Sequence, residues 1–179
     1  MSVPRLDPMP ADRPLTLRSA RTQDVPVIQA LVEPLARERV LLQKEAVAYY
    51  EAIQEFVVAE EPDGTLAGFG ALHVMWQDIA EVRTLAVSEA HRGAGVGHLL
   101  IEELLDRARA VGVERVFCLT FEVEFFRRHG FEVMADQSAV DPEVYAELLR
   151  STDEGVAEFL DLARVKPNTL GNTRMIRRL

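Results

Sequence analysis

The stretch Arg92-Gly93-Ala94-Gly95-Val96-Gly97 is the part of the sequence that most strongly indicates the fold. A strand-like apolar stretch ends shortly before it at Val87, and a helical pattern begins inside it at about Val96. Free backbone N–H groups and a helix N-terminus therefore meet at one point, and such a point binds phosphate oxygens without a lysine. Arg92 adds a fixed positive charge, and glycine lets a phosphate approach the backbone closely.

Two common phosphate-binding motifs are excluded at this loop. A Walker loop needs Gly-Lys followed by Ser or Thr, whereas Gly97 is followed by His98. A dinucleotide fingerprint that starts at Gly93 needs a glycine at the sixth position, and that position is again His98. The loop by itself leaves open a second interpretation, in which it is only a tight turn that starts a helix.

Strand and helix patterns alternate on both sides of the loop and predict a mixed α/β (α+β) fold. Strands are expected at 15–18, 56–59, 66–75, 79–87, 113–120, 131–134 and 173–177, with an antiparallel meander over 56–87. Helices are expected at 24–35, 43–51, 96–111, 122–129, 142–150 and 154–164, with apolar faces that include Val27, Val47, Tyr50, Leu99 and Val111. One domain over 15–179 is expected to follow a flexible, proline-rich arm at 1–14.

Composition restricts the function classes. The net charge is −9, which argues against nucleic acid as a partner because phosphate binding needs a basic face. No apolar run is long enough to span a bilayer and no signal peptide is recognisable, so a cytoplasmic protein without a membrane partner is expected. Cys118 is the single cysteine, and the four histidines show no metal-ligand spacing, so no metal is expected.

Two motifs resemble those of a known family. Leu85-Ala86-Val87, the glycine loop and the following Leu99-Leu100 resemble the acetyl-CoA motif of GNAT-fold acetyltransferases, whose pattern Arg/Gln-x-x-Gly-x-Gly/Ala is matched by Arg92, Gly95 and Gly97. The segment 125–131, Phe-Phe-Arg-Arg-His-Gly-Phe, resembles the family's Phe-Tyr-x-x-x-Gly-Phe segment. The resemblance covers about residues 15–135 and implies a mixed central sheet with splayed strands and flanking helices.

The resemblance also implies where the cofactor binds. Acetyl-CoA is the expected co-substrate, with the pantetheine arm on the backbone of Leu85, Ala86 and Val87 and with Phe126 nearby. The pyrophosphate is expected on Arg92, Gly93, Ala94, Gly95, Val96 and Gly97. The strands at 79–87 and 113–120 are expected to splay apart around the cofactor. The reaction implied is direct attack of an amine on the thioester, without an acyl-enzyme.

An attacking amine must lose a proton, so a catalytic base is useful. Glu81, on the strand leading into Leu85, is the first candidate, and a solvent-facing partner of Arg83 is the alternative interpretation. Glu122 is the second candidate, although an acid at a helix N-terminus is common without any catalytic role. Many members of the family protonate the leaving thiolate with a tyrosine at the position of Phe126, so water, dipoles or Thr120 must substitute here.

Cys118 and His129 have other expected roles. Cys118 lies in the middle of an expected strand and is predicted to pack in the core instead of acting as a nucleophile. His129 directly precedes Gly130 and is predicted to cap the C-terminus of the short helix.

The acceptor is indicated by a narrower resemblance, to the short, stand-alone N-acetylglutamate synthases of bacterial arginine biosynthesis. The stretches that carry it are 41–44, 50–56, 70–73, 81–87 and 158–160 through 172–175. The expected acceptor is the α-amine of L-glutamate, with L-glutamine not separable from it by sequence. No kinase-like domain of the longer synthases is present in the sequence, which puts arginine feedback of their kind in doubt.

Glutamate carries two carboxylates, which charge-assisted donors must balance in an acidic protein. The candidate substrate-binding residues are Lys44, Arg83, Lys166, Asn168, Asn172 and Arg174. Two rivals remain open: a GNAT enzyme for cationic amines, protein N-termini or lysines, and a non-catalytic acyl-CoA sensor. A homodimer is compatible with the fold.

Overall fold

The computed structural model describes residues 14–38, 40–41, 44–134, 140–160 and 172–179. The predicted arm at 1–14 lies outside the described residues except for Pro14. Within the described part, no helix is long and apolar enough to cross a membrane.

Seven strands form one sheet in the order β1-β2-β3-β4-β5-β7-β6. The strands are β1 (Thr16–Ser19), β2 (Phe56–Glu60), β3 (Leu66–Trp76), β4 (Ile79–Val87), β5 (Arg115–Thr120), β6 (Glu132–Val133) and β7 (Thr173–Arg178). All neighbouring pairs are antiparallel except β4 and β5, which are parallel. The mixed sheet and the meander predicted from sequence are therefore confirmed.

The central strands β4 and β5 separate toward their carboxyl ends. Their pairing runs from Ile79 opposite Arg115 to Val82 opposite Cys118 and stops there. Both strands continue further, β4 to Val87 and β5 to Thr120. Backbone groups of β4 beyond Val82 are therefore free of β5, and the predicted splay is present at this point.

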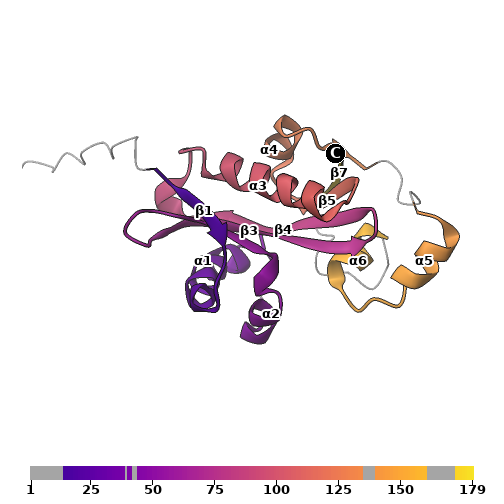
Figure 1. The fold of residues 1–179 in the computed structure, drawn as a ribbon, viewed down its shortest axis with the longest axis horizontal. Helices are drawn as coiled ribbons and strands as arrows, with labels where there is room; N and C mark the ends of the chain where they lie inside the picture. The colour runs from indigo at the N-terminus through magenta and orange to yellow at the C-terminus, as the bar shows by residue number, and fades with distance from the viewer. Residues whose placement is uncertain (1–13, 39, 42–43, 135–139, 161–171) are drawn as a thin grey trace, which may run out of the picture.

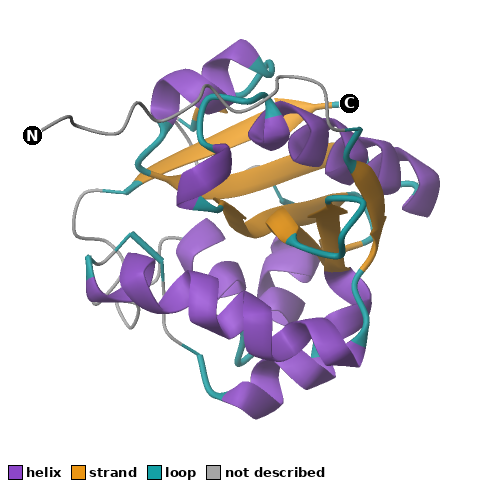
Figure 2. Ribbon diagram, turned by 90° about the vertical axis from the view of Figure 1, so that its left-hand side faces the viewer, coloured by secondary structure: helices purple, strands orange, loops and turns teal. Residues whose placement is uncertain are grey.

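Helices cover both faces of the sheet (Figures 1 and 2). They are α1 (Val25–Arg37), α2 (Ala46–Glu51), α3 (Val96–Val111), α4 (Val123–Arg128), α5 (Pro142–Leu148) and α6 (Glu154–Phe159), with short 3-10 turns at Thr22–Asp24, Ile53–Glu55 and Glu89–His91. One core cluster joins α3 to the sheet, and a second joins α1 and α2 to the opposite face. A third cluster packs α5 and α6 beside the carboxyl-terminal strand β7.

Helix α3 is capped at both ends by glycines in the left-handed region, Gly95 at φ 81° and Gly112 at φ 87°. Its core face is formed by Val96, Leu100, Ile101, Leu104, Leu105 and Ala108. The helix packs closely on β3, because a Cβ at Gly70 would lie 2.9 Å from Leu104 Cδ1. This close approach is possible because Gly68 and Gly70 of β3 have no side chains.

Several residues expected on apolar helix faces are exposed instead. Val27, Val47, Tyr50, Leu99 and Val111 have exposed side chains, and Tyr49 provides the buried aromatic ring of α2. Helix α2 begins at Ala46, later than predicted, and the predicted position 43 lies outside the described residues. Apolar residues in a short helix, or near the end of a longer one, do not fix which helical face is buried. Too few turns are available there for the apolar spacing to define one face.

Candidate active site

The splay between β4 and β5 opens into a cleft of about 1590 Å³. The cleft is lined by the end of β4 (residues 81–87), by the glycine loop and by Thr120 to Glu122 at the end of β5. The first residues of α6 and Asn172 line it as well. Segments that are far apart in sequence therefore form one continuous cavity, large enough for a cofactor and a small substrate.

A bulge in β4 presents backbone groups to this cleft. Phe69 of β3 pairs with Ala86, whereas Ala71 pairs with Arg83, so β4 contains one extra residue opposite Gly70. Thr84 in the bulge has φ 54°, which is unfavourable for a β-branched residue. Leu85, in the bulge, and Ala86 and Val87, which follow it, all line the cleft.

The three glycines of the loop have different structural roles. Gly93 and Gly95 have φ values of 80° and 81°, and neither has a neighbouring atom where a side chain would begin. Gly97 lies under the ring of Phe125, where an added Cβ would be 3.3 Å from the ring. Arg92, Gly93, Gly95, Val96 and Gly97 all line the cleft, while Ala94 is not among its described lining residues.

Glu81 is a buried residue of the cleft wall, and its surroundings form the inner end of the cleft. Its side chain is buried, and Arg83 Nη2 is 2.8 Å from its Oε2 atom. The geometry of that contact is that of an ion pair and not of a hydrogen bond, so Oε2 accepts no hydrogen bond among the described residues. Burial raises the pKa of the Glu81 carboxyl, although the charge of Arg83 opposes the rise.

Arg83 is held by a second carboxylate, from the start of α6. Its Nη1 and Nη2 atoms donate to Asp153 Oδ2 and Oδ1 at 3.0 and 3.1 Å. Asp153 also caps α6 by accepting from the Val156 N–H at 3.1 Å. Burial opposes ionisation of Asp153, but the charge and hydrogen bonds of Arg83 outweigh it and lower the pKa of Asp153.

Further charged groups surround this pair. His73 Nδ1 lies 2.6 Å from Glu55 Oε1, and His73 Nε2 lies 3.8 Å from Asp153 Oδ2. Lys44 lines the cleft and acts electrostatically on Glu81. Glu158 is a further buried carboxylate in the cleft wall. The inner end of the cleft therefore combines several acids with the cations Arg83 and Lys44.

The structure brings together only part of the predicted site. Arg83, Lys44 and Asn172 line the cleft with Glu81, and Glu122 lines it with an exposed side chain. Phe126 also lines it but is 5% exposed and packs edge-on against Phe125 and Phe131. Arg174 lies on β7, where it pairs with Leu119 of β5, and it is not among the described residues that line the cleft. Lys166 and Asn168 lie outside the described residues.

Cys118 and His129 occupy the positions predicted for them. Cys118 is 1% exposed in the core, and burial raises the pKa of its thiol, which disfavours a nucleophilic thiolate. His129 caps the C-terminus of α4.

Sequence reasoning missed Asp153, His73 and Gly155. Asp153 is separated from Arg83 by 70 residues. In the sequence it can be recognised only as an ordinary N-cap residue of a helix. Gly155 contacts Glu81 so closely that a Cβ there would lie 2.0 Å from Glu81 Oε2. No local pattern indicates such a contact, because it exists only after α6 has docked against β4.

Known proteins resemble this chain over most of its length. The amino-acid acetyltransferase of Mycobacterium tuberculosis is 53% identical over 169 residues, which are 93% of this chain and 96% of that protein. An amino-acid acetyltransferase of Neisseria meningitidis is 33% identical over 124 residues, which are 68% of this chain and 28% of that protein. The chain thus spans nearly all of the first relative and about a quarter of the second.

Solved structures agree with these relatives. The crystal structure of Rv2747 from Mycobacterium tuberculosis, in complex with CoA and NLQ, has a TM-score of 0.86 at 53% identity and covers 92% of this chain and 99% of that one. N-acetylglutamate synthase from Neisseria gonorrhoeae, complexed with coenzyme A and N-acetyl-glutamate, has a TM-score of 0.75 at 28% identity. The alignment covers 94% of this chain and 36% of the synthase.

The family follows from these observations together. The profile of the acetyltransferase (GNAT) family matches residues 27–131, which include the meander, the bulged strand β4, the glycine loop and α4. The splayed sheet and the cleft are the features that the family resemblance predicts. The chain therefore belongs to the GNAT acetyltransferase family and is an acyltransferase.

Proposed function

We propose that this enzyme transfers the acetyl group of acetyl-CoA to the α-amine of L-glutamate, as the first step of arginine biosynthesis, with L-glutamine as the alternative acceptor. The observation that carries the proposal is the position of Arg83, a half-buried guanidinium beside Glu81 at the inner end of the cleft. The 53% identity to an amino-acid acetyltransferase over nearly the whole chain supports an amino-acid acceptor.

Arg83 is suited to recognise a carboxylate of the acceptor. A guanidinium binds a carboxylate through two parallel N–H donors, and Asp153 already makes this bidentate contact. An incoming substrate carboxylate can share or replace the Asp153 contact, while Lys44 provides a second positive charge in the same wall. The substrate amine would then lie near Glu81, because Arg83 Nη2 contacts both carboxylates.

Glu81 is the proposed base for the attacking amine. Its raised pKa brings the carboxyl closer to neutral pH, where proton transfer from an ammonium is most effective. Its Oε2 atom is buried against Arg83 and Gly155, so the proton of the ammonium would reach the carboxyl through a water molecule or from its other side. The neutral amine attacks the thioester carbonyl directly, and the tetrahedral intermediate expels the thiolate of CoA.

The leaving thiolate needs a proton source other than a tyrosine. Thr120 is 8% exposed at the end of β5 and lines the cleft. Its hydroxyl oxygen accepts the Glu122 N–H at 2.8 Å, so its own proton can be directed toward the cleft. We propose that this hydroxyl donates a hydrogen bond to the sulfur as the thiolate leaves, and that a water molecule supplies the proton.

A cationic amine is the second candidate acceptor. Glu81, Asp153 and Glu158 place several carboxylates in the cleft, and such a surface attracts positively charged substrates. Arg83 pairs with two of these carboxylates and offsets one negative charge, and Lys44 adds a second cation to the cleft wall, which is why we place the amino acid first.

The acceptor is tested by thiol release from acetyl-CoA with each of the twenty amino acids, with polyamines and aminoglycosides in parallel. Turnover with glutamate or glutamine is the expected result. Turnover confined to cationic amines would replace the proposal by the second candidate. Binding of acetyl-CoA without turnover on any amine would contradict the proposed reaction and favour the sensor interpretation.

The glycine loop gives a prediction about the cofactor. Gly95→Ala forces φ 81° on an alanine and puts a methyl group into the open space beside the loop. We expect the KM for acetyl-CoA to rise and stability to fall by about 1–2 kcal/mol, since the left-handed conformation costs an L-residue that much. Steady-state kinetics and thermal unfolding measure both effects.

Gly64→Ala is the matched control for that prediction. Gly64 has φ 89°, also has no neighbouring atom where a side chain would begin, and lies in the turn between β2 and β3. It should lose similar stability while its KM for acetyl-CoA stays unchanged. An equal change in KM in both variants would mean that the loop does not hold the cofactor.

Gly155 gives a prediction about the position of the base. The Cβ of Gly155→Ala would overlap Glu81 Oε2, which is the movable end of a side chain. We expect Glu81 to be displaced, with a loss of kcat of about tenfold or more and little loss of stability, because small misplacements of reacting groups are costly. In a Glu81→Gln background the same change should cost almost nothing further. Additive losses would show that Gly155 does not act through Glu81.

A further inference from the structure

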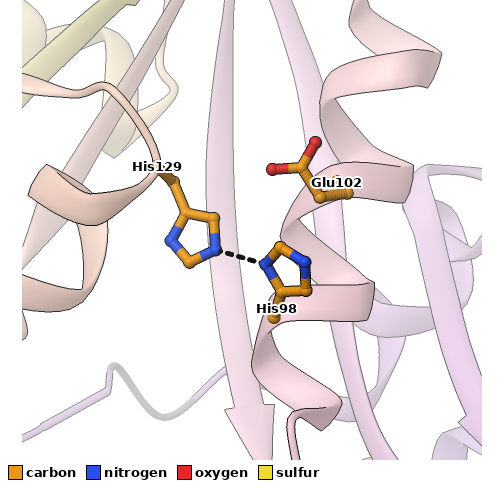
Figure 3. Close-up of side chains that lie close together, drawn as sticks. All are labelled: His98, Glu102 and His129. Carbon is orange, nitrogen blue, oxygen red and sulfur yellow. Dashed lines mark hydrogen bonds between the residues drawn. The ribbon is translucent and has the colours of Figure 1, made fainter.

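Three potential metal ligands meet between α3 and α4, outside the inner end of the cleft (Figure 3). His98 and Glu102 are four residues apart on α3 and share one face of the helix. His129 comes from the C-terminal end of α4. One ligand atom from each of the three residues lies within 4.8 Å of the others. The sequence predicted no metal-ligand spacing among the histidines, and the tertiary structure brings two of them together.

A hydrogen bond from the other ring nitrogen of His129 fixes the orientation of its ring. Its Nδ1 atom is 2.8 Å from the Phe125 carbonyl oxygen, which can only accept, so Nδ1 carries the proton. Its Nε2 atom therefore has a lone pair in the neutral ring, and this atom faces His98 Nδ1 at 2.9 Å. A metal-binding histidine is usually anchored in the same way, by donation of its other N–H to a carbonyl or carboxylate.

The spacing suits a small divalent cation. Zinc binds imidazole nitrogen at about 2.0–2.1 Å, so two nitrogens on a tetrahedral zinc are about 3.3 Å apart. The two histidine nitrogens need to separate by only a few tenths of an ångström from their present 2.9 Å. Two neutral imidazoles and one carboxylate carry a net charge of −1, which a dication more than balances.

We propose that His98, Glu102 and His129 form a binding site for a divalent transition metal, with zinc as its representative. Three protein ligands leave the fourth tetrahedral position for water or another ligand, as in open zinc sites. Imidazole and carboxylate donors favour zinc, copper or nickel over magnesium and calcium, which prefer oxygen-only sites. The site is independent of the proposed acceptor, because neither Glu81 nor Arg83 takes part in it.

The position of the site connects it to the cofactor loop. His98 directly follows Gly97, and the ring of His129 lies 4.6 Å from the ring of Phe125. Phe125 in turn covers Gly97. Bound metal would join the first turn of α3 to the end of α4, and these segments form one wall of the cleft. Metal binding should therefore stabilise the folded protein, since the unfolded chain does not hold the three ligands together.

The test is a calorimetric titration of untagged, chelator-treated protein with zinc chloride. We expect one site per chain in the wild type, and His98→Ala or Glu102→Gln should weaken it by more than about tenfold, since even outer-shell partners contribute 10–100-fold. Glu103→Gln is the matched control, because Glu103 is adjacent on α3 but pairs with Arg107 at 3.2 Å. Unchanged affinity in His98→Ala, or equal weakening by Glu103→Gln, would overturn the proposal.

A thermal shift gives a second readout. Zinc should raise the unfolding midpoint of the wild type and of Glu103→Gln, but not that of His98→Ala. His98 is exposed, so its replacement leaves the core intact. Absorption of bound cobalt(II) then distinguishes a tetrahedral site from loose surface binding. An octahedral spectrum, or the same shift in all variants, would contradict the proposed ligand set.

Discussion

Glu81→Gln is expected to lower kcat by about 10²–10⁴-fold, the range that a positioned general base contributes. The amide is nearly the same size as the carboxyl, so the buried contacts with Arg83 and Gly155 should largely remain. The affinity for acetyl-CoA should change little, because Glu81 lies near the start of β4 whereas the glycine loop follows the end of that strand. Steady-state kinetics and calorimetric binding of CoA measure the two effects separately.

Glu122→Gln serves as the comparison for this prediction. Glu122 was the second candidate base, but its side chain is exposed at the start of α4. Its replacement should cost much less than that of Glu81. If the order of the two losses were reversed, Glu122 would be the base and Glu81 a structural partner of Arg83.

The pH dependence follows from the direction of the pKa shift. Burial raises the pKa of Glu81, and the reaction needs its ionised form. In the pH profile of kcat/KM, the apparent pKa of the acidic limb should therefore lie above the ordinary glutamate pKa of about 4.3. Activity should be lost as the pH falls through this raised pKa. The limb should disappear in Glu81→Gln. A limb at the ordinary glutamate value would contradict a buried base.

Arg83→Ala is expected to raise the KM for the amino acid by roughly 10- to 100-fold. A hydrogen bond to a charged group contributes about 1.5–3 kcal/mol, and 1.4 kcal/mol is a factor of ten in affinity. The loss of Arg83 also removes the charge that opposes the pKa rise of Glu81, so the acidic limb should move to still higher pH. Stability should fall as well, because Asp153 and Glu81 lose their cation.

Comparison of two acceptors locates the carboxylate that Arg83 binds. If it binds the α-carboxylate, Arg83→Ala weakens glutamate and glutamine equally, whereas contact with the side-chain carboxylate weakens glutamate more. Arg109→Ala is the control, since Arg109 lies at the end of α3 and pairs with Asp106. No change in KM for either acceptor in Arg83→Ala would remove Arg83 from the substrate site.

Residue patterns alone predicted the order of the elements and the position of the glycine loop. Local chemistry is sufficient for this, because glycines at Gly93 and Gly95 are needed for positive φ and the pattern from Leu85 to Gly97 is contiguous. Glu81 and Arg83 could be selected for the same reason, since they lie on the strand that leads into the loop. The family resemblance connected these local features to the chemistry.

The contacts between distant groups, in contrast, could be found only in the folded chain. The contact of Asp153 with Arg83, the approach of Gly155 to Glu81 and the pairing of His98 with His129 each join segments separated by 31 to 74 residues (129 − 98 and 155 − 81). No local pattern encodes such contacts, because they arise when helices dock on the sheet and bury polar groups together. Burial is also what raises the pKa of Glu81, and burial is a property of the folded chain.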